Sequence, residues 1–101
     1  MPLPTVSFNP EAVLETEAAL DWYQDRSPRA ANAFLYDLDH AITRIREAPE
    51  AWPLYGNTCR RYIFPRFPFQ IIYRNVDNTI QSIAVAHGRT KPNYWKERVK
   101  K

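Results

Sequence analysis

The most regular hydrophobic pattern in the chain lies between residues 66 and 74, where aromatic and β-branched side chains recur at every second position. Because side chains of a β-strand alternate between two faces, this spacing predicts a strand with one buried face. A second apolar run covers 80–87, and the residues at 76–79 between the runs are typical of a tight turn. The two runs predict a β-hairpin. The side chains expected on the buried face of its first strand are Phe67, Phe69, Ile71 and Tyr73.

Two helices are predicted before this hairpin, each introduced by a capping residue and a proline. Asn9 and Ser27 can accept hydrogen bonds from free backbone N–H groups, and proline suits the first helical position. The helices are expected over 10–25 and 28–47, and Ala48 ends the second because it precedes a proline. Because only Arg26 and Ser27 separate the two predicted helices, we expect them to form an antiparallel helical hairpin. The expected buried stripes are Leu14, Ala18 and Trp22 on the first helix, and Phe34, Leu38, Ala41, Ile42 and Ile45 on the second.

Shorter elements complete the predicted order of β, α, α, β, β, β. Strands are expected at 5–8 and 60–64, and a loop over 50–57 should be attached to the body by Trp52 and Tyr55. Strands that are separated from helices along the chain indicate an α+β fold, with the helical hairpin packed on a curved antiparallel sheet. The predicted single domain, 1–101, comprises a strand at 1–8, a helical hairpin at 9–48, a three-stranded antiparallel sheet at 59–87 and a basic tail at 88–101.

Composition narrows the class of protein. The 101 residues are 45% hydrophobic and 14% aromatic, which is enough for a packed core. No apolar run approaches the length of a membrane span, and the first residues lack a signal-peptide pattern. Cys59 is the only cysteine, so it has no internal disulfide partner, and we expect a buried thiol in a reducing cytoplasm. Two histidines, one cysteine and two glycines favour neither a zinc site nor a phosphate-binding glycine loop, so no metal or cofactor is predicted.

The charges divide the chain into an acidic and a basic half. Residues 1–50 carry four arginines against nine acids, whereas residues 51–101 carry ten basic residues against two acids. This division indicates either a basic surface for a polyanion or acidic partner, or two halves that neutralise each other across the fold. The acids Glu15, Glu17 and Asp21 are expected to form a solvated flank of the first helix. The predicted basic, partner-binding surface consists of Arg60, Arg61, Arg66, Arg74, Arg89 and Lys91.

Some of these residues could also carry out RNA cleavage, which needs a proton acceptor, a proton donor and cations for the phosphorane. His87 could act as base or acid near neutral pH, and Tyr94 could stack on a nucleobase or donate a proton. A structural alternative stays open for each. His87 lies at the same alternate strand positions as Ile83 and Val85, so its side chain could point into the body and bond a backbone group. Tyr94 and Trp95 could instead pack a one-turn helical tail onto the sheet. His40, on the second helix, should face solvent. The candidate catalytic set is His87, Arg61, Arg66, Arg89 and Tyr94.

Several short motifs follow one another over nearly the whole chain. They are residues 6–12, Tyr23 before Ser27-Pro28, the apolar stripe leading to Pro49, residues 66–73, residues 84–89, Pro92, and Tyr94-Trp95. In order, spacing and total length, these motifs resemble the toxins of the RelE/ParE superfamily, from type II toxin–antitoxin modules, and most closely the ParE, or plasmid-stabilisation, branch.

The resemblance implies a small α+β toxin that inhibits growth and is neutralised by a cognate antitoxin, whose tail wraps over the helices or the sheet. ParE-type members act on DNA gyrase and cut nothing, whereas RelE-type members cut messenger RNA in the ribosomal A site. We therefore expect a cytoplasmic, gyrase-binding toxin that forms a hetero-oligomer with its antitoxin. A ribosome-dependent endoribonuclease and an inactive antitoxin-binding relative are the alternatives. The chain ends in Val99-Lys100-Lys101 rather than in the reactive tyrosine or histidine of nucleolytic relatives, which favours the gyrase hypothesis.

Overall fold

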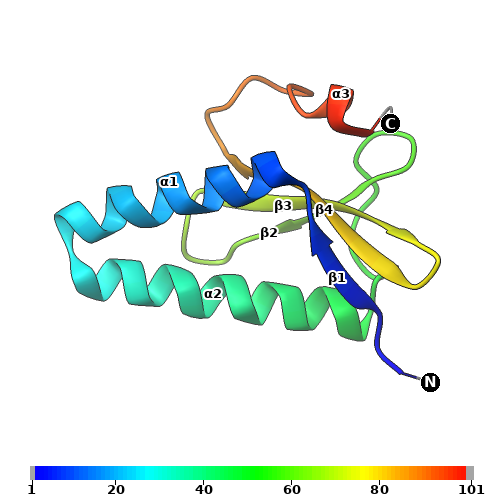
Figure 1. Cartoon of the computed structure of the whole chain (residues 1–101), viewed down its shortest axis with the longest axis horizontal. Helices are drawn as coiled ribbons and strands as arrows, with labels where there is room; N and C mark the ends of the chain where they lie inside the picture. Colours follow the sequence, from blue (N-terminus) through cyan, green and yellow to red (C-terminus); the bar gives the residue numbers. More distant parts are fainter. Residues whose placement is uncertain (1, 100–101) are drawn as a thin grey trace.

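The computed structural model describes residues 2–99, in which a pair of long helices covers one face of a four-stranded sheet (Figure 1). Residues 100 and 101, the last of the predicted basic tail, lie outside the described range. The α+β fold predicted from the sequence is confirmed. The elements in chain order are β1 (Thr5–Phe8), α1 (Pro10–Arg26), α2 (Pro28–Glu47), β2 (Arg60–Ile63), β3 (Phe69–Val76), β4 (Thr79–His87) and α3 (Lys96–Val99).

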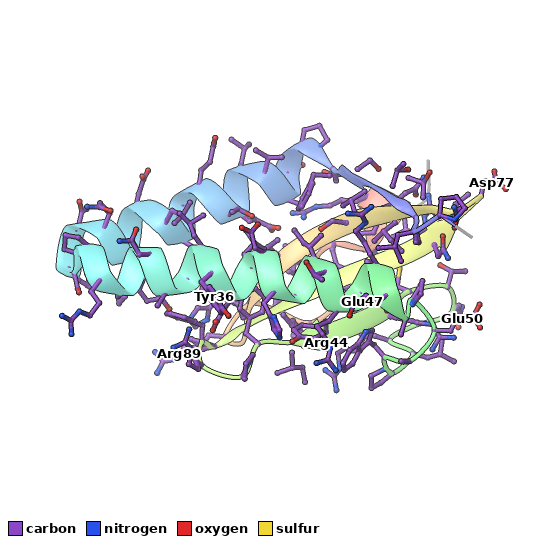
Figure 2. All side chains as sticks on the ribbon, turned by 90° about the horizontal axis from the view of Figure 1, so that it is seen from below. Tyr36, Arg44, Glu47, Glu50, Asp77 and Arg89 are labelled. Atoms are coloured by element: carbon purple, nitrogen blue, oxygen red, sulfur yellow. The ribbon has the colours of Figure 1, made fainter. Side chains whose placement is uncertain are left out.

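The sheet has the strand order β1-β4-β3-β2. Strands β2, β3 and β4 pair antiparallel as predicted, whereas β1 joins the edge of β4 in parallel, so the sheet is mixed. The β3–β4 hairpin turns at Asp77 and Asn78, both with positive φ (51° and 60°), which suits the right-handed twist of the strands. Asp77 projects from the tip of this hairpin, away from the body (Figure 2).

The predicted caps and the predicted stripe of α2 are confirmed. Asn9 accepts a hydrogen bond from the Glu11 N–H, and Ser27 accepts one from the Ala30 N–H. A single residue, Ser27, separates the two helices, which run antiparallel in Figure 1. Within residues 2–99, no helix is both long and apolar enough to cross a membrane. The α2 residues that pack toward the core are Phe34, Leu38, Ala41, Ile45 and, less deeply, Ile42.

The predicted buried stripe of α1 is wrong. Leu14 and Trp22 are 61% and 52% exposed, and Ala18 is also exposed. The buried residues are instead Ala12 and Ala19, with Tyr23 partly buried in the same cluster. The small side chains of Ala12 and Ala19 let α1 approach α2 and β4 closely. The buried side of α1 therefore carries less hydrophobic surface than the exposed side, which holds Leu14 and Trp22.

The sheet separates two hydrophobic clusters. On the helix side, Ile71 and Tyr73 of β3 pack with the helices, whereas Ile72 points to the opposite face. On that opposite face the tail is held by Trp95, which is 4% exposed, as predicted. The pairing of β3 with β4 shifts register at Ile72/Tyr73, so Ile83 joins the cluster on the tail side. The expectation that Ile83, Val85 and His87 share one face is therefore wrong, because the register shift puts Ile83 on the tail side while Val85 lies in the helix-side cluster.

Candidate functional site

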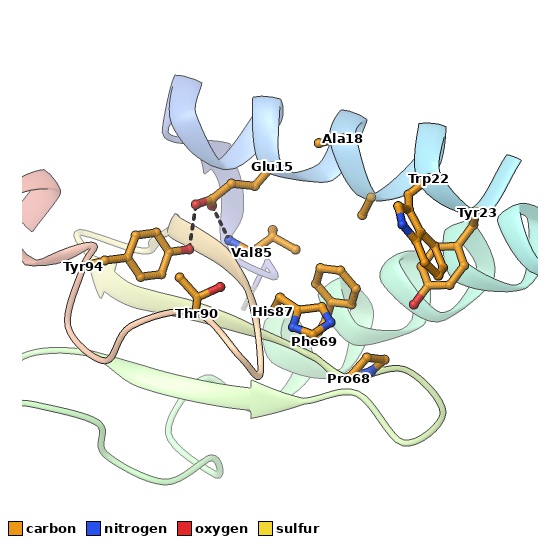
Figure 3. Close-up of a pocket in the computed structure, with 11 residues that line it drawn as sticks. Glu15, Ala18, Trp22, Tyr23, Pro68, Phe69, Val85, His87, Thr90 and Tyr94 are labelled. Atoms are coloured by element: carbon orange, nitrogen blue, oxygen red, sulfur yellow. Dashed lines mark hydrogen bonds between the residues drawn. The ribbon is translucent and has the colours of Figure 1, made fainter. Parts of the chain in front are cut away.

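An apolar groove lies between α1 and the end of β4 (Figure 3). It has a volume of about 450 Å³, and its α1 wall includes Ala18, Ala19 and Trp22. Phe69 and Val85 of the sheet contribute apolar side chains, and the partly buried His87 ring also faces it. We call this cavity the α1–β4 groove.

Glu15 lies at one end of the α1–β4 groove. The prediction that Glu15, Glu17 and Asp21 form a solvated flank is wrong for Glu15, which is partly buried and bonded. Its carboxylate accepts hydrogen bonds from the Val85 N–H (2.9 Å) and from the Tyr94 hydroxyl (2.6 Å), both visible in Figure 3. It also forms a salt bridge with Arg98 at 2.9 Å. Arg98 in turn donates to the Ile83 carbonyl at 3.1 Å. Glu15 and Arg98 thus satisfy the edge of β4 beyond the part that β1 covers, and they fasten the tail to α1.

Tyr94 is held neutral by this arrangement. Burial, followed by its hydrogen bond to the Glu15 carboxylate and the charge of that group, raises the pKa of the Tyr94 hydroxyl well above its usual range. The hydroxyl donates a hydrogen bond to the Glu15 carboxylate, so its bonding is structural in this conformation. The predicted packing of the tail by Tyr94 and Trp95 is confirmed for both residues.

A second, smaller pocket on the tail side brings several predicted candidates together. It has a volume of about 170 Å³, and Arg61, His87, Lys91 and Tyr94 all line it. The guanidinium of Arg61 lies 4.5 Å from the Tyr55 ring centroid. No aspartate or glutamate lines this cavity, so its charge is positive. We call it the basic pocket.

His87 lies where the two cavities meet. Its ring packs edge-on against Phe69 with centroids 5.0 Å apart. Its Nδ1 accepts a hydrogen bond from the Arg89 N–H at 3.0 Å, so a neutral His87 carries its proton on Nε2. The predicted bond from His87 to a backbone group is therefore present, and His40 is exposed on α2 as expected.

The other predicted arginines are mostly engaged by the chain itself. Arg66 makes two hydrogen bonds to Asp37, at 2.7 and 3.1 Å, and Asp37 is only 6% exposed. Arg60 donates to the Trp52 carbonyl at 2.7 Å. Arg74 donates to Gln81 at 2.7 Å on β4. These contacts hold α2, the 50–57 loop and the strands together, and they take Arg66 away from the basic pocket.

The predicted basic surface is therefore only partly assembled. Arg61 and Lys91 line the basic pocket, whereas Arg60, Arg66 and Arg74 bond to other parts of the fold. Arg89 is exposed and does not line this pocket, although its sequence neighbours Gly88 and Thr90 do. Within residues 2–99, the structure shows no hydrogen bond or salt bridge from the side chains of Arg89 and Lys91.

Two residues that matter to these sites were not singled out correctly from the sequence, namely Glu15 and Asp37. Both are carboxylates on helices, and nothing in the spacing of acids along α1 or α2 distinguishes them from solvated neighbours. In the part of the chain that the structure describes, no group of three His, Cys, Asp or Glu side chains could hold a metal ion.

Comparison with known proteins agrees with the fold and covers most of the chain. The family model described as "ParE toxin of type II toxin-antitoxin system, parDE" matches residues 6–92. The chain is 36% identical over 78 residues to Toxin ParE2 of Mycobacterium tuberculosis, in two strains, covering 74% of this chain and 72% of the relative.

Solved structures are similar in fold at lower identity. A chain of the chromosomal ParDE system from P. aeruginosa superposes with a TM-score of 0.72 at 17% identity, covering 84% of this chain and 96% of that one. A mutant of the E. coli toxin RelE in the free state gives a TM-score of 0.65 at 18% identity, covering 98% and 97%. From the extent of the family match and the identity to the mycobacterial toxin, this chain belongs to the ParE family of type II toxin–antitoxin toxins.

Proposed function

We propose that this chain inhibits growth by binding DNA gyrase and is neutralised by a cognate antitoxin, without cutting nucleic acid itself. The observation that carries the proposal is the state of the candidate catalytic residues. The Tyr94 hydroxyl is bonded to Glu15 and the Arg66 guanidinium to Asp37, and Arg66 does not line the basic pocket that Arg61, His87 and Tyr94 share. Binding by surface complementarity needs no such proton-transfer set, and membership of the ParE family supports this mode of action.

In this proposal the basic residues on the tail side contact the target. Arg61 and Lys91 line the basic pocket, and Arg89 is exposed next to it along the chain. Exposed cations with no carboxylate beside them increase the rate of association with an acidic surface and make that rate depend on salt. Arg60, Arg66 and Arg74 would contribute to the fold and to the long-range field rather than to direct contacts.

A second candidate function, ribosome-dependent cleavage of messenger RNA, is supported by the basic pocket. Arg61, His87, Lys91 and Tyr94 all line it, and the Nε2 proton of a neutral His87 could be transferred. For this reaction Tyr94 would have to leave Glu15 or act only by stacking. The contact at 2.6 Å counts against the first of these requirements.

Induced expression in a susceptible bacterium separates the two functions. An SOS reporter and the rate of amino-acid incorporation are followed in the same culture. We expect SOS induction while translation continues, because blocked gyrase leaves broken DNA. An immediate arrest of translation without SOS would contradict the gyrase proposal and favour the nuclease. Normal growth with folded, antitoxin-free protein would indicate an inactive relative.

The variant His87→Ala sharpens this comparison. Removing a positioned acid–base group lowers a catalysed rate by about 10²–10⁴-fold. A nuclease should therefore lose its toxicity in this variant, whereas a gyrase-binding toxin should retain most of it. Arg89→Ala serves as the companion, because loss of an exposed contact cation should weaken binding to the target, and therefore toxicity, in either case.

A further inference from the structure

The basic pocket gathers positive charge in a small space. Arg61 and Lys91 both line it, and among residues 2–99 no aspartate or glutamate lies in its wall. Figure 3 shows the Tyr94 hydroxyl directed to Glu15 of α1, so Tyr94 offers the pocket its ring rather than an acidic group. Cations without a carboxylate beside them favour the binding of an anionic group from outside the chain.

Arg61 is positioned in advance for such an anion. Its guanidinium packs over the Tyr55 ring, with 4.5 Å between its central carbon and the ring centroid. Its one side-chain hydrogen bond within residues 2–99 is a long contact of 3.5 Å to the Gln70 amide oxygen, so most of its N–H groups are available. Because the side chain is already ordered, little conformational entropy is lost when an anion binds to it.

Lys91 lies on a short loop that backbone hydrogen bonds hold in place. The Gly88 N–H donates to the Pro68 carbonyl at 2.7 Å, and the Thr90 N–H donates to the His87 carbonyl at 3.0 Å. The Lys91 side chain is exposed and forms no hydrogen bond or salt bridge within residues 2–99. Its charge is therefore available, together with that of Arg61, to an anion that enters the pocket.

The size of the basic pocket limits what can enter it. Its volume of about 170 Å³ is below the range of about 300–1,000 Å³ that is typical of sites for whole small molecules. A single anionic group on a short stem fits this space, whereas a complete nucleotide exceeds it. The pocket is therefore suited to one group that projects from a larger partner.

The state of the other arginines favours a carboxylate of a protein over a phosphate of a nucleic acid. A nucleic-acid strand is held by cations that contact successive phosphates. Arg60, Arg66 and Arg74 are instead bonded within the fold. Positive charge available to a partner is therefore concentrated at the basic pocket and at Arg89, whose neighbours in the chain line it, which matches one carboxylate better than a row of phosphates.

An exposed apolar side chain lies next to the basic pocket. Ile63 is 61% exposed, and it shares a strand face with Arg61 because the two residues are two positions apart on β2. Its partner in the pairing of β2 with β3 is Gln70, which lines the pocket. An exposed isoleucine beside a charged cavity suits a protein partner, because protein interfaces combine apolar contacts with polar and charged ones.

We propose that the basic pocket binds the carboxylate of an Asp or Glu side chain on an extended segment of the target protein, and that Ile63 packs against an apolar side chain two positions away in that segment. Positions two apart in a strand, such as Arg61 and Ile63, are separated by about 7 Å, and an extended partner has the same repeat. The apolar side chain therefore reaches Ile63 while the carboxylate pairs with Arg61 and Lys91. The identification of this target as gyrase rests on the proposed function, which the inference deepens by naming the chemistry of recognition.

The charge and spacing rules are tested with short labelled peptides that contain Leu-x-Glu, Leu-x-Gln or Ser-x-Glu in an otherwise neutral sequence. Binding to the purified chain is followed by fluorescence anisotropy. We expect the Leu-x-Glu peptide to bind about tenfold more tightly than the Leu-x-Gln peptide, and more tightly than the Ser-x-Glu peptide. Ile63→Gln should abolish the preference for Leu over Ser and keep the preference for Glu. Lys91→Gln and Arg61→Gln should each remove most of the preference for Glu over Gln.

Matched controls come from exposed positions of α2. Arg29→Gln removes the same charge as the pocket variants, and Leu35→Gln removes an apolar side chain that is 43% exposed. Neither substitution should change any of the peptide affinities. Thermal unfolding, followed by circular dichroism, verifies that each variant is folded. Because Lys91 is exposed, Lys91→Gln alone decides the charge rule if Arg61→Gln does not fold.

Several results would overturn the proposal. They are equal affinities for the Glu and Gln peptides, a preference for Glu that survives Lys91→Gln, a preference for Leu that survives Ile63→Gln, or no binding of any peptide to the wild-type chain. A short single-stranded RNA that binds more tightly than the Leu-x-Glu peptide and competes with it would also overturn the proposal, in favour of a phosphate site.

The source of the carboxylate is tested with purified gyrase, immobilised on a sensor surface and exposed to the wild-type chain and the same variants. We expect the affinity to fall about tenfold or more in Lys91→Gln and in Ile63→Gln, but not in Arg29→Gln. Equal binding of all variants to gyrase would overturn the proposal even if the peptides obey both rules, because the target would then be recognised elsewhere. A wild-type chain that does not bind gyrase contradicts the proposed function, and the peptide results still decide what the pocket binds.

Discussion

At the scale of single residues, Glu15 is the acceptor on which three donor groups converge. Its two carboxylate oxygens accept from a backbone amide, a tyrosine hydroxyl and a guanidinium, which come from β4 and the tail. The side chains of Glu15 and Arg98 are 23% and 13% exposed, so the charges have lost much of their hydration. A carboxylate in this position is favourable only because all these donors converge on it.

Glu15→Ala should therefore destabilise the fold strongly. The substitution leaves the Val85 N–H, the Tyr94 hydroxyl and the Arg98 charge without their acceptor, and breaking a buried pair costs about 3–5 kcal/mol. Urea unfolding measures the change in free energy. Glu17→Ala, two residues away and exposed, is the control and should stay within about 0.5 kcal/mol of the wild type. Similar stabilities for the two variants would show that the Glu15 contacts contribute little.

Tyr73 should make stability fall at alkaline pH. Its hydroxyl donates to the Pro49 carbonyl at 2.7 Å, and burial raises its pKa from 10.0 to about 12, although the nearby Arg60 charge lowers it. Above pH 10 the unfolded chain loses this proton while the folded chain keeps it, so the free energy of unfolding decreases as pH rises toward 12. Urea midpoints across this interval measure the slope. Tyr73→Phe should reduce it, whereas Tyr36→Phe at an exposed site should not. Equal slopes would contradict this origin.

At the scale of elements, the sequence predicted α2 better than α1 for a physical reason. On α2 the large apolar side chains and the buried side chains are the same residues, such as Phe34 and Ile45. On α1 the core contact uses Ala12 and Ala19, while the large side chains Leu14 and Trp22 form an external surface. Hydrophobic periodicity detects large side chains, so it locates a stripe on α1 correctly and assigns that stripe to the wrong surface.

Contacts between segments that are distant along the chain were the second feature that the sequence could not predict. The strand at 5–8 was predicted, but its parallel pairing with β4 depends on where α1 and α2 return the chain. The Glu15–Tyr94 contact joins residues 79 positions apart, which no local motif can indicate. In the basic pocket, Arg61, His87 and Tyr94 were identified by chemistry, whereas the engagement of Arg66 by Asp37 required the fold.

The two adjacent alanines of α1 allow a direct test of this reading. Ala19 is 6% exposed and packs in the helix-side cluster, so Ala19→Leu should strain the contact of α1 with its neighbours. Overpacking of this kind costs about 1–3 kcal/mol. Ala18→Leu places the same side chain on the exposed stripe and should change the free energy of unfolding by less than about 0.5 kcal/mol. If Ala18→Leu were instead the more destabilising variant, Ala18 would belong to the buried side of α1, as the hydrophobic periodicity predicted.

At the scale of the whole molecule, the acidic first half and the basic second half are joined by ion pairs. Both salt bridges in the described range, Arg66–Asp37 and Arg98–Glu15, connect a carboxylate of a long helix to an arginine of the second half. The sheet lies between the two hydrophobic clusters, and within residues 2–99 its second face is covered by side chains of the loop and the tail, such as Tyr55 and Trp95. Part of the charge asymmetry therefore serves internal closure, while other charged side chains, among them Glu17, Asp21, Arg89 and Lys91, stay exposed.

Closure of the tail can be measured through Cys59, which is 1% exposed and shares a cluster with Trp95. Burial raises the pKa of its thiol, so it should react slowly with a thiol reagent such as DTNB in the native state. Trp95→Ala removes the largest side chain that the tail contributes to this face and should cost about 3–5 kcal/mol. We expect the DTNB rate to rise about tenfold or more, because each factor of ten in the opening equilibrium corresponds to about 1.4 kcal/mol.

The control for this measurement is Trp22→Ala, which removes an indole of the same size from the exposed stripe and should leave the DTNB rate unchanged. Near-ultraviolet circular dichroism verifies that each variant is folded before labelling, so that a fast reaction reports local opening of the tail rather than global unfolding. A folded Trp95→Ala variant in which Cys59 stays as slow as in the wild type would show that the loop at 50–57, and not the tail, shields this face of the sheet.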